Sequence, residues 1–132
     1  MSGASFSNGI RTFLYRVWDD TLPIINILMY FPSIADENKD DTTIKRIISI
    51  IKNNNYGGIN VYNLNTIDEF LSEQTRHGKL IIAWGNKVTK KENDNIIHSL
   101  QGKYELYCFK KNNNGNPSLP TRLPNNIVLE KY

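Results

Sequence analysis

Short apolar runs alternate with helical repeats along most of this chain, and this alternation limits the folds that it can adopt. The run from Leu22 to Tyr30 is almost continuously apolar, which is typical of a strand covered on both faces. Isoleucines then recur at helical spacing from Ile44 to Ile51, before the helix-stopping sequence NNNYGG. The sequence therefore predicts a three-layer α/β domain with a mostly parallel central sheet and helices on both faces.

The rest of the chain follows the same alternation. Strands are expected at residues 58–64, 79–85 and 103–109, and helices at residues 66–74 and 91–101. The polar segment KNNNGNPSLPTRLPNN then contains three prolines, which predicts a long surface loop before a last strand at residues 127–132.

The N-terminal part has a weaker pattern. Residues 11–18 alternate in polarity like a strand, and the Asp19-Asp20 turn predicts that they form a hairpin with residues 22–30. Residues 1–10 are small, polar and aperiodic, so a flexible segment is expected there, ahead of a single domain at residues 11–132.

Size and charge set broad limits on function. The chain has 132 residues, which suits one domain, and 16 basic against 13 acidic residues give it a net charge of +3. This charge permits an anionic partner, including nucleic acid, but is smaller than a dedicated nucleic-acid stripe requires. No apolar run approaches the roughly 20 residues that cross a bilayer, so a cytoplasmic protein without a membrane partner is expected. Self-association is left open.

Few residues suggest metal or cofactor chemistry. Cys108 lies in the apolar run YELYCF and is expected to be a buried structural thiol. His77 and His98 have no partner at zinc-ligand spacing, and no phosphate-binding or nucleophile motif is present. We therefore predict no metal site and no cofactor.

Four acidic residues, Asp36, Glu37, Asp40 and Asp41, lie where a strand is expected to lead into a helix. Carboxylates can bind a divalent cation, but acids at a helix N-terminus also complement its dipole. We favour the second interpretation, with Asp41 or Thr42 as the N-cap.

Two other groups of side chains have alternative interpretations. Thr43 and Arg46 could bind an anion at the helix start, or Arg46 could pair with an acid of its own helix. Arg16 and the aromatic residues near the strand ends could stack on a base, or the aromatics could belong to the core. Trp84 is the stronger candidate because it ends an apolar strand, where ligands bind in α/β sheets.

The order of the segments RTFLYRVW, FPSIADENKDDTTIKR, YGGINVYNL, IIAWG and GNPSLPTRL resembles the family known as domain of unknown function 1643, from about Arg11 to Leu123. In that family the first motif runs Asn-Pro-Ser-x-Ala-Asp, followed by Asp-Pro-Thr and a basic pair. The positions kept here are Pro32, Ser33, Ala35, Asp36, Asp41, Thr43 and Arg46. Phe31 stands where the family has Asn, and Leu119 stands where it has His.

The motif order of this family is similar to that of the uracil-DNA glycosylase superfamily. This resemblance implies a glycosylase-like fold, in which a Pro-containing loop and a late His-Pro loop face one nucleobase pocket. Phe31 and Leu119 occupy the two positions that would position water and stabilise the developing charge. The resemblance therefore favours a pocket that binds without the usual catalytic groups.

We accordingly predict a nucleotide-binding protein without turnover, with a nucleotide or cyclic nucleotide as its ligand. In a virus, such a protein could evade immunity by sequestering a host nucleotide signal in the host cytoplasm. The alternatives are an enzyme acting on a nucleobase or its glycosidic bond, with Asp36 or Asp41 as general base, and a protein inhibitor of a host enzyme. The expected ligand-binding residues are Arg16, Phe31, Pro32, Ser33, Ala35, Asp36, Thr43, Arg46, Asn63, Trp84, Gly115, Asn116, Pro117 and Arg122.

Within the opening motif, residues 31–36 are expected to form one wall of the pocket. Asp36 is expected to face the ligand, whereas Asp40 and Asp41 are expected to face solvent and the helix amides.

Overall fold

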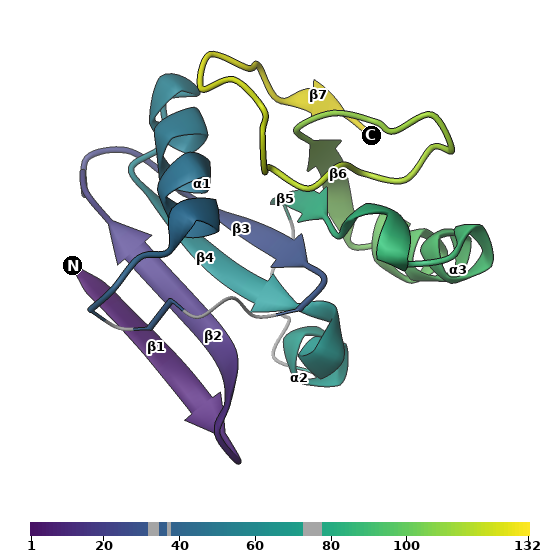
Figure 1. The fold of residues 1–132 in the computed structure, drawn as a ribbon, viewed down its shortest axis with the longest axis horizontal. Coiled ribbons are helices and arrows are strands. Elements are labelled where there is room, and N and C mark those ends of the chain that lie inside the picture. Colours follow the sequence, from purple (N-terminus) through teal and green to yellow (C-terminus); the bar gives the residue numbers. More distant parts are fainter. Residues whose placement is uncertain (32–34, 37, 73–77) are drawn as a thin grey trace.

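The computed structural model describes residues 1–31, 35–36, 38–72 and 78–132. Its seven strands form one sheet in the order β1-β2-β4-β3-β5-β6-β7 (Figure 1). The strands are β1 (Ser2–Ser7), β2 (Ile10–Val17), β3 (Ile24–Met29), β4 (Gly58–Asn63), β5 (Gly78–Ala83), β6 (Tyr104–Cys108) and β7 (Glu130–Lys131). The protein is therefore an α/β protein, as the alternating pattern predicts.

The sheet is mixed, so the prediction of a mostly parallel sheet is wrong. Strands β4, β3, β5 and β6 pair in parallel, whereas β1 with β2, β2 with β4, and β6 with β7 pair antiparallel. The antiparallel pairs lie at the two sides of the sheet and enclose the parallel strands.

The expected hairpin between residues 11–18 and 22–30 is also wrong, because β4 inserts between β2 and β3. Strand β2 instead forms a hairpin with β1, where the sequence predicts a flexible segment. Asn8 and Gly9 connect these two strands with φ angles of 52° and 77°. Positive φ angles at both turn positions match the right-handed twist of a two-residue hairpin, and Asn-Gly is the usual sequence for it.

Within the described residues, three α-helices cover the sheet: α1 (Thr42–Asn53), α2 (Ile67–Ser72) and α3 (Lys90–Gln101). Ile44 and Ile47 of α1 share a hydrophobic cluster with Ile27 of β3. Helices α2 and α3 contribute to a second cluster that contains Leu28, the next residue of that strand. Because successive strand residues point to opposite faces, α1 covers one face and the other two helices cover the opposite face.

Helix α1 begins as the sequence predicts. The Asp41 side chain accepts a hydrogen bond from the Ile44 backbone N–H at 2.9 Å, which confirms Asp41 as the N-cap. Within the described residues, none of the helices has the length and apolar character to span a membrane.

Cys108 is fully buried in β6, as predicted, and burial is the main reason why the pKa of its thiol rises to about 12. A raised pKa keeps the thiol protonated at pH 8, and the thiolate is the reactive form. We expect Cys108 to react with a thiol reagent at pH 8 only after denaturation. Rapid reaction in the native protein, measured by absorbance, would contradict this burial.

Candidate ligand-binding site

A cavity of about 260 Å³ opens where β3 and β5 end. The chain leaves β3 through α1 toward β4 on one side, and β5 lies on the other side of β3. The strand order therefore reverses here, which is the usual ligand position in an α/β sheet. The lining residues are Arg11, Met29, Tyr30, Phe31, Thr43, Ile44, Trp84, Lys87, Leu119, Pro120 and Thr121.

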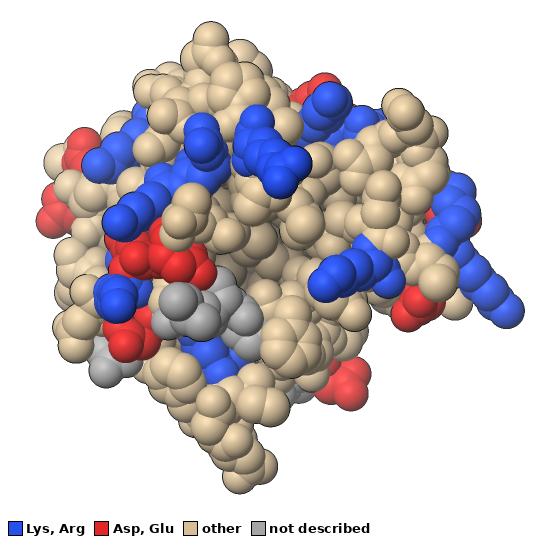
Figure 2. Space-filling view, viewed as in Figure 1, with Lys and Arg blue, Asp and Glu red and all other residues tan. Residues whose placement is uncertain are grey.

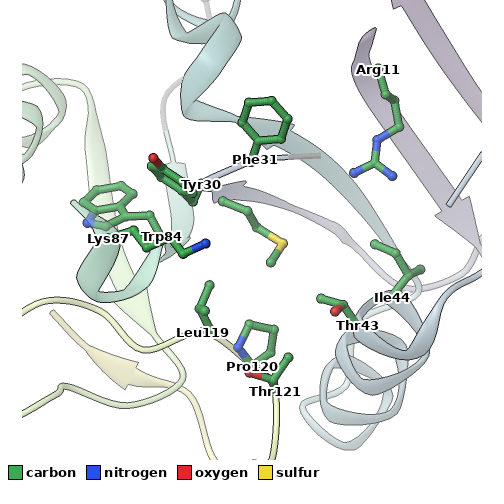
Figure 3. Close-up of a pocket in the computed structure, with 11 residues that line it drawn as sticks. Arg11, Tyr30, Phe31, Thr43, Ile44, Trp84, Lys87, Leu119, Pro120 and Thr121 are labelled. Carbon is green, nitrogen blue, oxygen red and sulfur yellow. The ribbon is translucent and has the colours of Figure 1, made fainter. Parts of the chain in front are cut away.

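Most of the cavity wall is apolar, and its parts come from distant segments of the chain. Tyr30 and Phe31 follow β3, and Leu119 and Pro120 belong to the long loop after β6 (Figure 3). Phe31 is 60% exposed, so its ring is available to a ligand. Flat apolar surfaces of this kind suit an aromatic ring system.

Two cationic side chains approach the cavity from different sides in Figure 3. Arg11 is only 3% exposed, and its Nη1 donates to the Ala35 carbonyl at 2.9 Å. Burial lowers the pKa of Arg11, and the nearby Asp41 carboxylate opposes this shift. Lys87 is exposed and makes no ion pair with any other residue in the described ranges.

Charge is distributed unevenly around this face of the molecule. Figure 2 shows a hollow near the centre, with Lys and Arg side chains on several sides and acidic side chains gathered on one side. An anionic group would therefore meet attractive charge on the sides of the cavity that carry Lys and Arg, and repulsion on the acidic side (Figure 2).

Asn63, a predicted site residue, ends β4 and is not among the residues that line the cavity. Asn63 pairs in register with Met29 of β3, and Met29 lines the cavity. Strand β4 lies between β3 and β2, and β2 carries the lining residue Arg11. Asn63 is 1% exposed, and neither its Nδ2 nor its Oδ1 has a hydrogen-bond partner among the described residues. Buried amides without partners are rare, because each lost hydrogen bond is costly.

A buried hydrogen-bond network holds the Trp84 wall in place. The indole Nε1 of Trp84 donates to Asn93 Oδ1 at 2.8 Å, and Asn93 Nδ2 bonds the Tyr132 hydroxyl at 3.2 Å. That hydroxyl donates to the Gly115 carbonyl at 2.6 Å. The network therefore joins β5, α3, the C-terminus and the long loop.

The predicted residues Gly115, Asn116 and Pro117 position the loop and do not line the cavity. Asn116 Nδ2 donates to the carbonyls of Gly85 and Val88 at 3.2 and 2.8 Å, and the Gly85 N–H donates to the Pro117 carbonyl at 2.9 Å. Gly85 has a φ angle of 75°, and a Cβ there would lie 2.8 Å from Leu119 Cγ. These contacts bring the following residues of the loop, 119–121, to the cavity.

Arg16 was predicted to contact the ligand, but it does not line the cavity and has a structural role instead. It is 7% exposed, and its Nε forms a 2.8 Å ion pair with Asp40. It also donates to the carbonyl of Asp36. Arg16 thus holds Asp36 and Asp40 against β2. Asp40 was expected to face solvent and the helix amides, but it is the ion-pair partner of Arg16.

The Asp36 carboxylate also differs from the expectation that it faces the ligand. Its Oδ1 accepts the backbone N–H groups of Asn38 and Lys39 at 2.9 and 2.8 Å. The hydrogen bond from Asn38 is the main reason why the pKa of Asp36 is lowered. This carboxylate therefore closes a turn, and it is not among the residues that line the cavity.

Some of the remaining predicted site residues line the cavity, and others do not. Phe31, Thr43 and Trp84 line the cavity. Arg46 donates to the Leu123 carbonyl at 2.9 Å and to Asn125 Oδ1 at 3.0 Å, so it holds the C-terminal segment instead of pairing with an acid of its helix. Ala35 is buried as the acceptor of Arg11, and Arg122 is exposed outside the lining. Pro32 and Ser33 lie outside the described residues.

The sequence interpretation missed the two cations of the cavity, Arg11 and Lys87. Arg11 follows a register shift in the β1–β2 pairing, which changes the face on which its side chain lies. Lys87 lies two residues after the predicted strand at residues 79–85, and this proximity was the available signal. Among the described residues, no group of three or more His, Cys, Asp or Glu side chains could hold a metal ion.

Residues 11–69 match the model of the family described as "Protein of unknown function (DUF1643)". This match confirms the family resemblance from the start of β2 into α2, a range that includes Arg11, Phe31, Thr43 and Asn63. No curated protein and no solved structure gives a significant match.

Proposed function

We propose that the protein binds a nucleotide in this cavity and retains it without turnover. The main support is the combination of aromatic and aliphatic walls with two cations at the position where the strand order reverses. Apolar walls bind a base, and cations bind phosphate. The cavity of about 260 Å³ is slightly smaller than typical small-molecule sites, which begin near about 300 Å³.

In this proposal the base packs against the Phe31 ring on one side, and Leu119 lies on its other side. Asn63, whose register partner Met29 lines the cavity, provides a donor and an acceptor for the base edge, which would satisfy its buried amide. The phosphate lies toward Lys87 at the exposed rim, where its charge remains partly solvated.

The contacts of the two candidate bases favour binding over catalysis. A base-acting enzyme would use Asp36 or Asp41 as its general base. The Asp41 carboxylate caps α1, and the Asp36 carboxylate closes a turn with a lowered pKa, which makes it a weaker base. A protein-inhibitor role has less support, because it gives no reason for cations beside an apolar cavity.

The proposal includes an architecture like that of the uracil-DNA glycosylase superfamily, supported by the motif order and by helices on both faces of the sheet. If the protein is viral, sequestration of a host nucleotide signal in the cytoplasm would suit a binder without turnover.

Phe31→Ala tests the base-stacking wall. Stacking on an aromatic side chain contributes about 1–3 kcal/mol per base, so nucleotide affinity should fall by about tenfold or more. Stability should change little, because the Phe31 side chain is 60% exposed. Calorimetric titration measures the affinity, and denaturant unfolding measures the stability.

Phe6→Ala is the matched control, because Phe6 is 50% exposed and does not line the cavity itself, although it pairs in register with the lining residue Arg11. It should leave nucleotide affinity unchanged. Equal losses of affinity in both variants would count against Phe31 as the stacking surface.

A further inference from the structure

A second cavity, of about 330 Å³, lies on the other side of Tyr30 and Phe31, which line both cavities. Helices α2 and α3 and the segments that lead into them form the rest of its wall. Its lining residues are Tyr30, Phe31, Leu64, Asn65, Ile67, Val88, Glu92 and Ile96.

Two consecutive residues, one of them a cation, also line the two cavities. Lys87 lines the first cavity, and its neighbour Val88 lines the second. Both belong to the short segment that leads from β5 to α3. An anionic group bound by Lys87 would therefore lie next to both cavities.

The second cavity differs from the first in its charge. Its apolar side chains Leu64, Ile67 and Ile96 are only half-buried, so they can contact a ligand. Its charged group is Glu92, whose Oε1 accepts the Thr89 N–H at 3.2 Å. A carboxylate repels phosphate but accepts hydrogen bonds from amino or hydroxyl groups, so this cavity suits a neutral ring system.

We propose that the ligand contains two bases joined through phosphate, with one base in each cavity. The Phe31 ring separates the two bases, and Lys87 binds the linking phosphate. This inference rests on the proposed nucleotide binding and specifies its ligand class. A free dinucleotide and a step of single-stranded nucleic acid share this chemistry.

The test compares nucleoside monophosphates with the matching 3′,5′-linked dinucleoside monophosphates ApA, GpG, CpC and UpU. At least one dinucleotide should bind about tenfold or more tightly than its monophosphate, because a second base is stacked. Ile96→Trp fills the second cavity and should reduce that dinucleotide to the affinity of the monophosphate, without weakening the monophosphate.

Asn95→Trp is the matched control, because Asn95 is exposed on the same helix and does not line either cavity. It should leave the dinucleotide advantage intact. Ile67→Trp fills the same cavity from α2 and replaces Ile96→Trp if that variant does not fold.

Two outcomes separate this inference from the proposed function. If monophosphates bind and no dinucleotide binds more tightly, the two-cavity inference is wrong and the proposed function stands. If neither class of probe binds, both are wrong. Where a dinucleotide does bind more tightly, a single-stranded octanucleotide identifies the source: affinity above that of the dinucleotide indicates nucleic acid, and equal or lower affinity indicates a free dinucleotide.

Discussion

Asn63→Leu is expected to raise the free energy of unfolding of the ligand-free protein by about 1–3 kcal/mol, and to weaken nucleotide binding by about tenfold or more. The Asn63 carboxamide is 1% exposed and has no hydrogen-bond partner among the described residues. Leucine has the same branched skeleton without polar atoms, so it removes this desolvation penalty, and it also removes the donor and acceptor that the base edge would use. Denaturant unfolding and calorimetric titration measure the two effects.

Asn93→Leu is the matched control, because Asn93 is also 1% exposed but bonds both Trp84 and Tyr132. Its replacement should lower the free energy of unfolding, since it leaves the Trp84 N–H buried without an acceptor. The opposite signs of the two variants are the diagnostic result. A loss of stability in Asn63→Leu comparable to that in Asn93→Leu would contradict a ligand role for Asn63.

Trp84→Ala is expected to lower the free energy of unfolding by about 3–5 kcal/mol, which is the largest stability effect that we predict. Trp84 is 1% exposed within the cluster that joins β5 to α3, and its indole forms part of the buried network. The substitution also removes one wall of the cavity. Thermal and denaturant unfolding measure the loss.

The other tryptophan, Trp18, provides the comparison. It is only partly buried, and its Nε1 donates to the Tyr56 carbonyl at 3.0 Å, far from the cavity lining. Trp18→Ala should therefore cause a smaller loss of stability and leave nucleotide affinity unchanged. Equal losses of stability in the two variants would mean that Trp84 does not anchor the packing between β5 and α3.

Local signals explain what the sequence predicted correctly. The N-cap at Asp41 and the isoleucine spacing of α1 depend on neighbouring residues, which the sequence displays directly. The position of Phe31 and Trp84 at the cavity follows because parallel strands bring their carboxyl ends to one edge. The Asn8-Gly9 turn is an equally local signal for the β1–β2 hairpin, and it contradicts the flexible segment predicted at residues 1–10.

Contacts between segments that are distant in the sequence explain most of what the sequence did not predict. Nothing in the pattern of residues 11–18 distinguishes β3 from β4 as a partner, because both strands are similarly apolar. The contacts of Arg16 depend on which loop lies over β2, so the sequence did not reveal its hydrogen bond to the Asp36 carbonyl. The Asp36 carboxylate instead bonds the backbone of its own loop, which is a local contact. The cavity position of Arg11 depends on the register shift in the β1–β2 pairing.

The central claim is that the cavity binds a nucleotide, and a thermal-shift and calorimetric titration of refolded, ligand-free protein tests it most directly. A panel of nucleotides and cyclic nucleotides should contain at least one ligand that adds about 2.7 kcal/mol of stability at 100 times its dissociation constant. That stabilisation should be much weaker in Phe31→Ala and unchanged in Phe6→Ala. Absence of both heat and stabilisation with every nucleotide, from a protein that unfolds cooperatively, would contradict the claim.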